Sequence, residues 1–375
     1  MASDPLVLVL NAGSSSLKLA LISRSGERPL NLSLALEAMA PSALAERLEP
    51  WRQRIALVGH RVVHGGERFT APTRLDGAER DAVLAALEAL VPLAPLHNGP
   101  ALALIRWCLQ AFPQPQWACF DTAFHSTLPE AARTYALPAS WRQQGLRRYG
   151  FHGLNHAHVA AVVAAQVTPR QAPLRLISAH LGAGCSLAAI RDGRCLDTTM
   201  GYTPLDGLVM ASRSGSIDPG LILHLLEQGL EPAELAVALN ERSGLLGLSG
   251  LSGDWRRLGE AAAEGHGGAR LALAVFEHRL LQGIGAMAAS LGGVDVLALS
   301  GGIGANDPAL AASLAERLQW LGPLQLLQIP ADEEGMIAQL VLKAAADDAE
   351  ADAISRDPAD RGSDAAAGSG AGDRH

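Results

Sequence analysis

The sequence predicts an α/β protein built from two similar domains, and three observations support this. Apolar runs of strand length alternate with longer segments of helical spacing along most of the chain. A length of 375 residues is sufficient for two hydrophobic cores. Ala-Gly-Ser-Ser at 12–15 is similar to Ala-Gly-Cys-Ser at 183–186, and each lies between two strand-like runs. This offset of 171 residues predicts a duplicated unit with a glycine-bearing phosphate loop in each half, whereas two ordinary tight turns are the alternative.

The first half alternates short apolar runs with amphipathic segments. Asn98 is predicted as the N-cap of one helix, because asparagine suits that position and Pro100 would lie early in the helix. The predicted strands are 6–10, 17–22, 55–58 and 117–120, and the predicted helices are 42–48, 78–90 and one that ends at 112.

The second half contains the most informative stretch, residues 176–220. An apolar run breaks at Gly182-Ala183-Gly184, whose backbone N–H groups can face an anion without obstruction. Asp192-Gly193 predicts a hairpin, because both residues accept positive φ. The predicted strands are 176–181, 186–190, 195–199, 294–299 and 326–329, and the predicted helices are 157–167, 219–228, 232–240, 269–291, one that starts at 307 and a last one to about 345, with a Gly/Ser loop at 248–253.

Composition and charge exclude several classes of protein. No apolar run reaches the ~18 residues of a membrane span, and nothing resembles a basic patch for nucleic acid. The four cysteines form no Cys-x-x-Cys motif, so a reducing cytoplasm is expected. The net charge is −8, and the segment 346–375 holds eight acids and three arginines. Its Ala/Asp/Gly-rich composition predicts a disordered acidic tail.

Several polar residues stand where catalytic groups are expected. Arg61 follows a buried run and precedes paired glycines, so it is either aimed into a cleft or a surface arginine at a turn. Asp121 follows a buried strand and is a candidate metal or catalytic ligand, with a helix cap as the alternative. Arg213 lies in a Ser-Arg-Ser-Gly loop and could grip phosphate or carboxylate with two prongs. Lys18 is one of only two lysines and lies just beyond a serine run.

Three histidines at 152, 156 and 158 raise the question of a zinc site. A His-x-His pair places its side chains on different helix faces, and no third ligand follows at a suitable spacing. His152 is therefore interpreted as a donor in a loop and His156 as a helix-start residue. A strand, a glycine turn and a helix start at 294–307 predict an anion or nucleotide site. It is neither a dinucleotide fingerprint nor a Walker A motif.

Together these stretches resemble the acetate kinase family of the actin-like, sugar-kinase-like ATPases, over nearly the whole chain to about residue 345. The motifs occur in order and are specific. They are Asn-Ala-Gly-Ser-Ser-Ser-Leu-Lys (11–18), Gly-His-Arg-Val-Val-His-Gly-Gly (59–66), Pro-Leu-His-Asn (95–98), Phe-Asp-Thr-Ala-Phe-His (120–125), Tyr-Gly-Phe-His-Gly (149–153) and the stretch from 176 through Arg213.

The resemblance implies two duplicated ribonuclease H-like domains that close over a nucleotide, in a homodimer. Residues 1–150 with the final helix at about 331–345 would form the N-terminal domain, and 151–330 the C-terminal domain with the nucleotide site. The implied reaction is reversible transfer of the γ-phosphoryl group of ATP to the carboxylate of acetate, giving ADP and acetyl phosphate. Mg²⁺ would assist, with Mn²⁺ as a substitute.

The resemblance also implies roles for individual residues. Arg61 and Arg213 would hold the carboxylate and the moving phosphoryl group. His152 would donate to that group, with His97 in support, and Asp121 would orient Arg61 and engage the metal. The remaining implied residues are Asn11 and Glu333 (or Glu334) for magnesium; Ser14, Ser16, Lys18, His180, Gly182 and Gly184 for the phosphates; Asp254, Trp255, Arg256, Gly302 and Ile303 for adenosine; and Val63, Leu96, Phe151 and Pro204 around the methyl group.

The chain departs from the family's usual residues at several positions. Ala183, Ser216 and Ala305 stand where asparagine, aspartate and glutamate are usual, and Gly99 replaces a proline. The two alanines leave nucleotide affinity and the choice of phosphate donor open. One methylene is worth only about 1–3 kcal/mol in an apolar pocket, so the sequence leaves the choice between acetate and propionate open, and both are candidate acceptors. A butyrate-type kinase and a non-catalytic ATP-binding sensor are the alternative functions.

Overall fold

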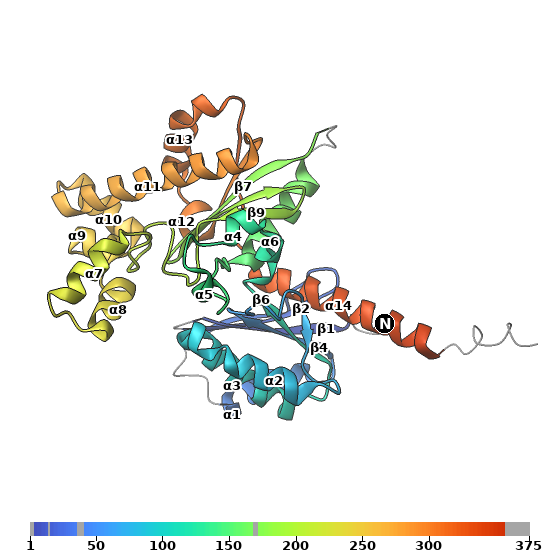
Figure 1. Ribbon diagram of the computed structural model, residues 1–375. Helices are drawn as coiled ribbons and strands as arrows, with labels where there is room; N and C mark the ends of the chain where they lie inside the picture. Colours follow the sequence, from blue (N-terminus) through green and yellow to red (C-terminus); the bar gives the residue numbers. More distant parts are fainter. Residues whose placement is uncertain (1–3, 14–15, 36–40, 168–171, 357–375) are drawn as a thin grey trace, which may run out of the picture.

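A computed structural model describes residues 4–13, 16–35, 41–167 and 172–356. Two β-sheets form the centres of two units, and helices cover both faces of each sheet (Figure 1). The first sheet has the strand order β3-β2-β1-β4-β6-β5, and the second has the order β11-β10-β7-β8-β9. Among the described residues, no helix combines the length and hydropathy needed to cross a membrane.

The first unit is built mainly from the N-terminal part of the chain. Its strands are β1 (Leu6–Ala12), β2 (Ser16–Ser23), β3 (Leu30–Ala35), β4 (Ile55–Val62), β5 (Thr73–Arg74) and β6 (Gln116–Phe120). Its helices are α1 (Pro41–Leu48), α2 (Arg80–Ala89), α3 (Pro95–Ala111) and the C-terminal α14 (Glu333–Arg356), with the 3₁₀ turns η2 (Glu49–Trp51) and η3 (Val91–Leu93).

The second unit follows after a connecting segment. That segment contains η4 (Ala123–Thr127), α4 (Glu130–Arg133) and α5 (Ala139–Arg142). The strands of the second sheet are β7 (Arg175–Leu181), β8 (Cys185–Arg191), β9 (Arg194–Thr198), β10 (Val296–Ser300) and β11 (Gln325–Gln328). Its helices are α6 (Gly153–Gln166), α7 (Pro219–Glu227), α8 (Pro232–Glu241), α9 (Gly244–Ser249), α10 (Trp255–Ala263), α11 (Gly267–Leu291), α12 (Gly301–Gly304) and α13 (Pro308–Arg317), followed by η5 (Gln319–Leu321).

The two sheets share one topology, which confirms the predicted duplication. In each sheet three consecutive strands pair antiparallel, and the first of them also pairs with a parallel strand. The two hairpins differ in length, because Ala12 pairs with Leu17 across the first turn, whereas Leu181 pairs with Cys185 across the second. A single offset of 171 residues therefore does not align both strands of one hairpin with those of the other.

Side-chain alternation decides which helices each sheet face meets. In β1, Leu8 and Leu10 belong to the core under α2 and α3, whereas Val7 and Val9 pack with α14. Gly59 of β4 permits the close approach of α14, because a Cβ there would lie 2.8 Å from Ile337. The C-terminal helix therefore completes the N-terminal unit, as Figure 1 shows.

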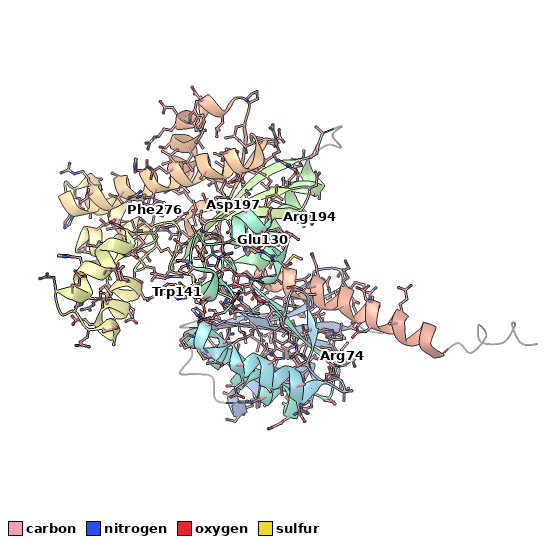
Figure 2. The ribbon with its side chains drawn as sticks, viewed as in Figure 1. Arg74, Glu130, Trp141, Arg194, Asp197 and Phe276 are labelled. Atoms are coloured by element: carbon pink, nitrogen blue, oxygen red, sulfur yellow. The ribbon has the colours of Figure 1, made fainter. Side chains whose placement is uncertain are left out.

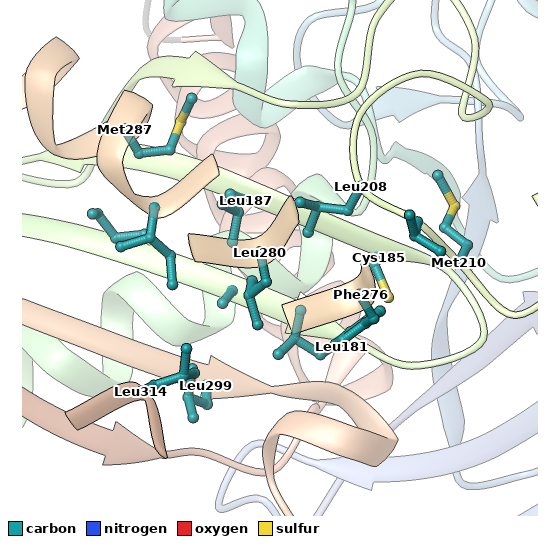
Figure 3. Close-up of a cluster of buried hydrophobic side chains, with 14 of the residues drawn as sticks. Leu181, Cys185, Leu187, Leu208, Met210, Phe276, Leu280, Met287, Leu299 and Leu314 are labelled. Atoms are coloured by element: carbon teal, nitrogen blue, oxygen red, sulfur yellow. The ribbon is translucent and has the colours of Figure 1, made fainter. Parts of the chain in front are cut away.

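The second sheet is sandwiched in the same way. Leu181 and Leu187 pack against Phe276 and Leu280 of α11 in the core drawn in Figure 3. Figure 2 places Phe276 in this unit and Arg74 at the far side of the first one. Residues on the opposite face, such as Leu176 of β7, pack against α6.

The helix predicted after Asn98 begins earlier, at Pro95, so Asn98 is not its N-cap. Proline is well tolerated in the first position of a helix, because its missing N–H has no partner there. Asn98 is instead buried within α3. Its Oδ1 accepts a hydrogen bond from the His64 N–H at 3.1 Å, and its Nδ2 donates to the His64 carbonyl at 3.0 Å. It therefore ties α3 to the segment after β4.

Two other expectations need correction. The Gly/Ser segment 248–253 is partly helical, because α9 runs to Ser249, and α10 then follows at Trp255. The C-terminal helix continues to Arg356, so residues 346–356 are helical and not disordered. Alanine has the highest helix propensity, which favours this extension, and Asp348 forms an ion pair with Arg74 at 3.4 Å. Residues 357–375 of the predicted tail lie outside the described ranges.

Candidate active site

Predicted catalytic residues of the first unit gather at one edge of its sheet. Asn11 lies near the end of β1, Arg61 near the end of β4, and Asp121 directly after β6. These strands are parallel neighbours, so their carboxyl ends meet, which is where open α/β sheets bind ligands. Glu333 and Glu334 at the start of α14 reach the same edge.

Arg61 is held by three acidic or amide side chains. Its Nη2 donates to Asp121 Oδ2 at 2.6 Å, its Nη1 donates to Asn11 Oδ1 at 3.0 Å, and Nη1 lies 3.9 Å from Glu333 Oε2. Burial opposes the charge, yet Asp121 and Glu333 raise the pKa of Arg61 above its ordinary value. Asp121 does not cap a helix, because Thr122 is the N-cap of η4. The contacts match the expectation that Asp121 orients Arg61.

Both glutamates at the start of α14 contact Asn11. Its Nδ2 donates to Glu333 Oε2 at 2.9 Å and to Glu334 Oε1 at 2.6 Å. Lys18 Nζ is 3.9 Å from Glu334 Oε1, although about half of the lysine side chain is exposed. Burial would raise the pKa of Glu333, but Arg61 and a nearby histidine lower it to about 2, so this carboxylate is ionised. Because both glutamates contact Asn11, both are candidates for the predicted magnesium site.

These oxygen atoms suit a magnesium ion in their chemistry. Carboxylate and amide oxygens are the hard ligands that Mg²⁺ prefers. Within the described ranges, no group of three or more His, Cys, Asp and Glu side chains forms a complete metal cage. Mg²⁺ commonly takes only one or two protein carboxylates and completes its shell with water and substrate phosphates. The donor set at Asn11, Glu333 and Glu334 fits that pattern.

In the second unit, Gly184 lets two predicted catalytic residues converge. A Cβ at this position would lie 2.6 Å from Arg213 Nη2 and 3.1 Å from His152 Nε2. Arg213 Nη1 donates to the Pro204 carbonyl at 2.6 Å, which fixes the loop arginine. His152 has a left-handed backbone (φ 57°) immediately before α6, and its ring lies 4.3 Å from the ring of His180.

Arg61 and Arg213 both lie close enough to His97 and His152 to affect the pKa values of these histidines. Burial lowers the pKa of His97 to about 4, and Arg61 and Arg213 contribute in the same direction. Burial also lowers the pKa of His152 well below its ordinary value, with His180, Arg213 and Arg61 adding to the effect. Arg61 comes from the first sheet and Arg213 from the second unit. Each of the two histidines therefore lies near an arginine from either unit.

The predicted adenosine residues line one cavity of about 570 Å³. This volume is within the range of small-molecule and cofactor sites. The Trp255 indole donates to Asp307 Oδ2 at 2.5 Å and thereby joins α10 to the start of α13. Gly302 has no atom within 4 Å of a Cβ position, so the cavity wall is open there. The predicted residues that line the cavity are Gly182, Asp254, Trp255, Arg256, Gly302 and Ile303.

The predicted acyl pocket is described in part. Val63 and Phe151 are buried in the same hydrophobic cluster. Pro204 adjoins the site through its hydrogen bond from Arg213. The side chain of Leu96 and the whole of Ser14 lie outside what the structure describes. Ser16 begins β2, and its carbonyl accepts a hydrogen bond from the Gly13 N–H at 2.8 Å.

Sequence reasoning missed several residues of the site. The predicted adenosine cavity is also lined by Ala211, Gly253, Asn306 and Asp307. The sequence indicated a helix start at Asp307 but not the contact of Asp307 with Trp255. The three histidines considered for zinc each contact an oxygen atom of the protein. His152 and His156 each contact the hydroxyl of Ser186, and His158 contacts the carbonyl of Pro330.

Comparison with known proteins agrees with this geometry. The sequence profile described as the acetokinase family matches residues 27–339. The chain belongs to the acetokinase family. It is 46% identical over 349 residues to the acetate kinase of Deinococcus deserti, covering 84% of this chain and 86% of that one. It is 52% identical over 276 residues to the acetate kinase of a Synechococcus strain, covering 73% and 68%.

Solved structures of this family have the same architecture. Porphyromonas gingivalis acetate kinase matches with a TM-score of 0.83 and 33% identity, covering 91% of this chain and 100% of that chain. A propionate kinase from Francisella tularensis matches with a TM-score of 0.80 and 34% identity, covering 90% and 99%. This acetokinase chain therefore has the actin-like fold that its motifs implied, with two ribonuclease H-like units.

Proposed function

We propose that this protein is an acetate kinase, which transfers the γ-phosphoryl group of ATP directly to a carboxylate oxygen of acetate. A bond forms between that oxygen and the γ-phosphorus, and the bond to the bridging oxygen of ADP breaks. The observation that carries the proposal is the convergence of Arg213 and His152 over Gly184, next to a cavity of nucleotide size. The curated relatives named acetate kinase support acetate as the acceptor.

The residues suit a loose phosphoryl transition state, for which a protein mainly aligns the reactants and neutralises oxygen charge. Arg61 and Arg213 would meet that charge from opposite units, and Asp121 would hold Arg61 in place. His152, neutral at pH 7, would donate a hydrogen bond to the moving group. Bound magnesium would neutralise phosphate charge, with Asn11, Glu333 and Glu334 as the residues that hold it.

The homodimer belongs to the same proposal, with α7 at the interface. None of the residues of α7 is buried, although the helix is strongly apolar. Leu221 and Leu223 are 47% and 61% exposed, and Ile217 just before the helix is 38% exposed. Exposed apolar side chains gathered on and beside one helix are typical of protein–protein contact sites. A second copy of the chain is the occupant that the proposal assigns.

The domain boundaries and the compartment follow from the same proposal. We assign residues 1–150 with 331–345 to one domain and 151–330 to the other, because α14 packs on the first sheet. The cytoplasm is the proposed compartment, and four free cysteines support a reducing environment. Propionate remains a second acceptor, supported by the propionate kinase of Francisella tularensis.

Trapping of the acyl phosphate tests the function. Hydroxylamine converts acetyl phosphate to a hydroxamate, so purified protein would be incubated with ATP, Mg²⁺ and acetate, propionate or butyrate. We expect hydroxamate with acetate and less with butyrate, and none when ATP or the acid is omitted. Binding of ATP without hydroxamate from any acid would instead establish the sensor function. Preference for butyrate would indicate a butyrate-type kinase.

A further inference from the structure

A chain of buried hydrogen bonds leads from His152 into the second unit. His152 Nδ1 lies 3.0 Å from Ser186 Oγ, and the same oxygen lies 2.8 Å from His156 Nε2. His156 Nδ1 in turn lies 2.9 Å from Ser178 Oγ. Ser186, His156 and Ser178 are fully buried, each with 0% exposure. We call these four residues the serine–histidine chain.

The fold brings these residues together across the contact between α6 and the second sheet. Ser178 of β7 and Ser186 of β8 lie on the sheet face that meets α6. Neighbouring apolar positions on that face, Leu176 and Ala188, pack against the apolar side of α6. The two hydroxyl groups are therefore placed where the first turn of α6 presents His156.

The position of His152 requires one particular tautomer for phosphoryl transfer. Its Nε2 faces the space over Gly184, toward Arg213, while its Nδ1 faces Ser186. A neutral imidazole carries only one N–H. If that proton is on Nε2, then Nδ1 must accept a hydrogen bond, and only a group with a donor hydrogen can supply it. The Ser186 hydroxyl is such a group.

The rest of the chain supports that direction. When the Ser186 O–H donates to His152, its oxygen is free to accept from His156 Nε2–H. His156 Nδ1 then accepts from the Ser178 hydroxyl. Every link has one donor and one acceptor in this arrangement. A carboxylate behind Nδ1 would instead hold the proton on Nδ1 and leave Nε2 as a base, as in the Ser-His-Asp triad.

We propose that Ser186, His156 and Ser178 are positioning residues that keep His152 in the neutral Nε2–H form, so that it donates to the transferred phosphoryl group. The inference rests on the proposed phosphotransferase function. The proposal explains how His152 can act as a hydrogen-bond donor although two arginines lie near it. Burial, His180 and two arginines disfavour protonation of His152, so a neutral donor supplies the hydrogen bond and the arginines supply the charge.

Kinetics of paired variants test the proposal. Ser186→Ala removes the donor to Nδ1, and we expect kcat to fall about 10- to 100-fold, the range seen when an outer hydrogen-bond partner of a functional histidine is lost. The KM for ATP and for acetate should change little, because Ser186 is fully buried and acts through His152. His156→Leu should behave like Ser186→Ala, whereas His156→Gln, whose amide can donate to Ser186, should keep most of the activity.

A matched control separates this effect from the loss of any buried hydroxyl. Thr198 in β9 is also buried, but it does not belong to the serine–histidine chain. Its hydroxyl donates to the Leu187 carbonyl at 2.7 Å. Thr198→Val should therefore lower stability but leave kcat near the wild-type value. Wild-type kcat in Ser186→Ala, with His152→Ala impaired, would overturn the proposal while the acetate kinase function stands.

Nitrogen-15 NMR of labelled histidine reads the tautomer without any activity measurement. We expect His152 to show the pattern of a neutral ring protonated on Nε2 in the wild type, and Ser186→Ala to shift it toward the Nδ1–H form. An Nδ1–H ring in the wild-type protein, free and with ADP and Mg²⁺ bound, would contradict the proposal. Absence of acetyl phosphate from the wild type would overturn the function separately, because the tautomer result does not depend on it.

Discussion

Gly184 shows how much of the site depends on single residues. Any side chain there would collide with the Arg213 guanidinium, 2.6 Å from the Cβ position, and would separate it from His152. The side chain of Arg213 has few alternative conformations, because its Nη1 donates to the Pro204 carbonyl. Within the described part of the chain, no hydrogen bond engages the other guanidinium nitrogens, so they can face a ligand. The absence of a side chain at Gly184 therefore allows Arg213 and His152 to approach each other at the predicted anion site.

The two arginines give the sharpest residue-scale prediction. Arg61→Lys and Arg213→Lys should each lower kcat by about 10²–10³ at saturating ATP and acetate, the usual effect of removing one preorganised donor from a closed site. A lysine cannot reproduce the two-pronged geometry, so it should rescue poorly. The KM for ATP should rise less than kcat falls, because the charge develops mainly in the transition state.

Steady-state kinetics with circular dichroism as the folding control would measure this effect. Arg279→Lys on the exposed face of α11 is a matched control, for which we expect unchanged kcat. Near-normal kcat in Arg213→Lys would show that Arg213 only anchors its loop through Pro204.

Among the elements, α7 is an apolar helix that has no buried residue in the single chain. It begins with a well-formed cap, because the Asp218 carboxylate accepts a hydrogen bond from the Gly220 N–H at 2.9 Å. Leu221 and Leu223 nevertheless remain exposed. A cap and high apolar content stabilise the helix but do not provide it with a partner.

A charge on α7 tests the proposed dimer. Leu223→Glu should convert a dimer to a monomer, because burial of a carboxylate in an apolar contact is strongly unfavourable. Size-exclusion chromatography with light scattering would measure the mass. Trp320→Glu on η5, where the tryptophan is 68% exposed, is the matched control and should leave the dimer intact. A monomeric wild-type protein would contradict the dimer.

At the scale of the whole molecule, buried histidines should make the fold sensitive to acid. Burial lowers the pKa of His60, His64, His125 and His180 to about 4. The unfolded chain therefore binds more protons than the folded chain between about pH 4 and pH 6.5, and the free energy of unfolding should fall as pH falls through this window. Asp121 opposes the trend, because burial raises its pKa.

Urea unfolding at pH 7.5, 6.5, 5.5 and 5.0 would measure this dependence. Among the described residues, the side chain of His60 has one hydrogen-bond partner, Gln116, and His60→Gln should reduce the slope by at most ~1.4 kcal/mol per pH unit. His278→Gln, an exposed residue of α11, should leave the slope unchanged. Equal stability at pH 7.5 and pH 5.0 would show that the buried histidines do not control acid unfolding.

The sequence by itself determined the alternation of strands and helices, the Asp192-Gly193 hairpin and the family. Both hairpin residues have the positive φ that the dipeptide predicted, because this preference is local. The family resemblance also predicted that Arg61, Asp121, His152 and Arg213 belong to one site. Local patterns are sufficient for the strands, the helices and the hairpin, since each of these depends mainly on neighbouring residues.

Only the tertiary structure decided the features that depend on distant contacts. Asn98 resembled a helix cap, but its partner is the backbone of His64. The contacts among Ser178, Ser186 and His156 could not be predicted from the sequence, because these hydrogen bonds, with that of His152, join residues 22 to 34 positions apart across α6 and the second sheet. The physical reason is that hydrogen-bond partners in a folded chain are selected by packing, and packing brings together side chains whose spacing in the sequence has no fixed period.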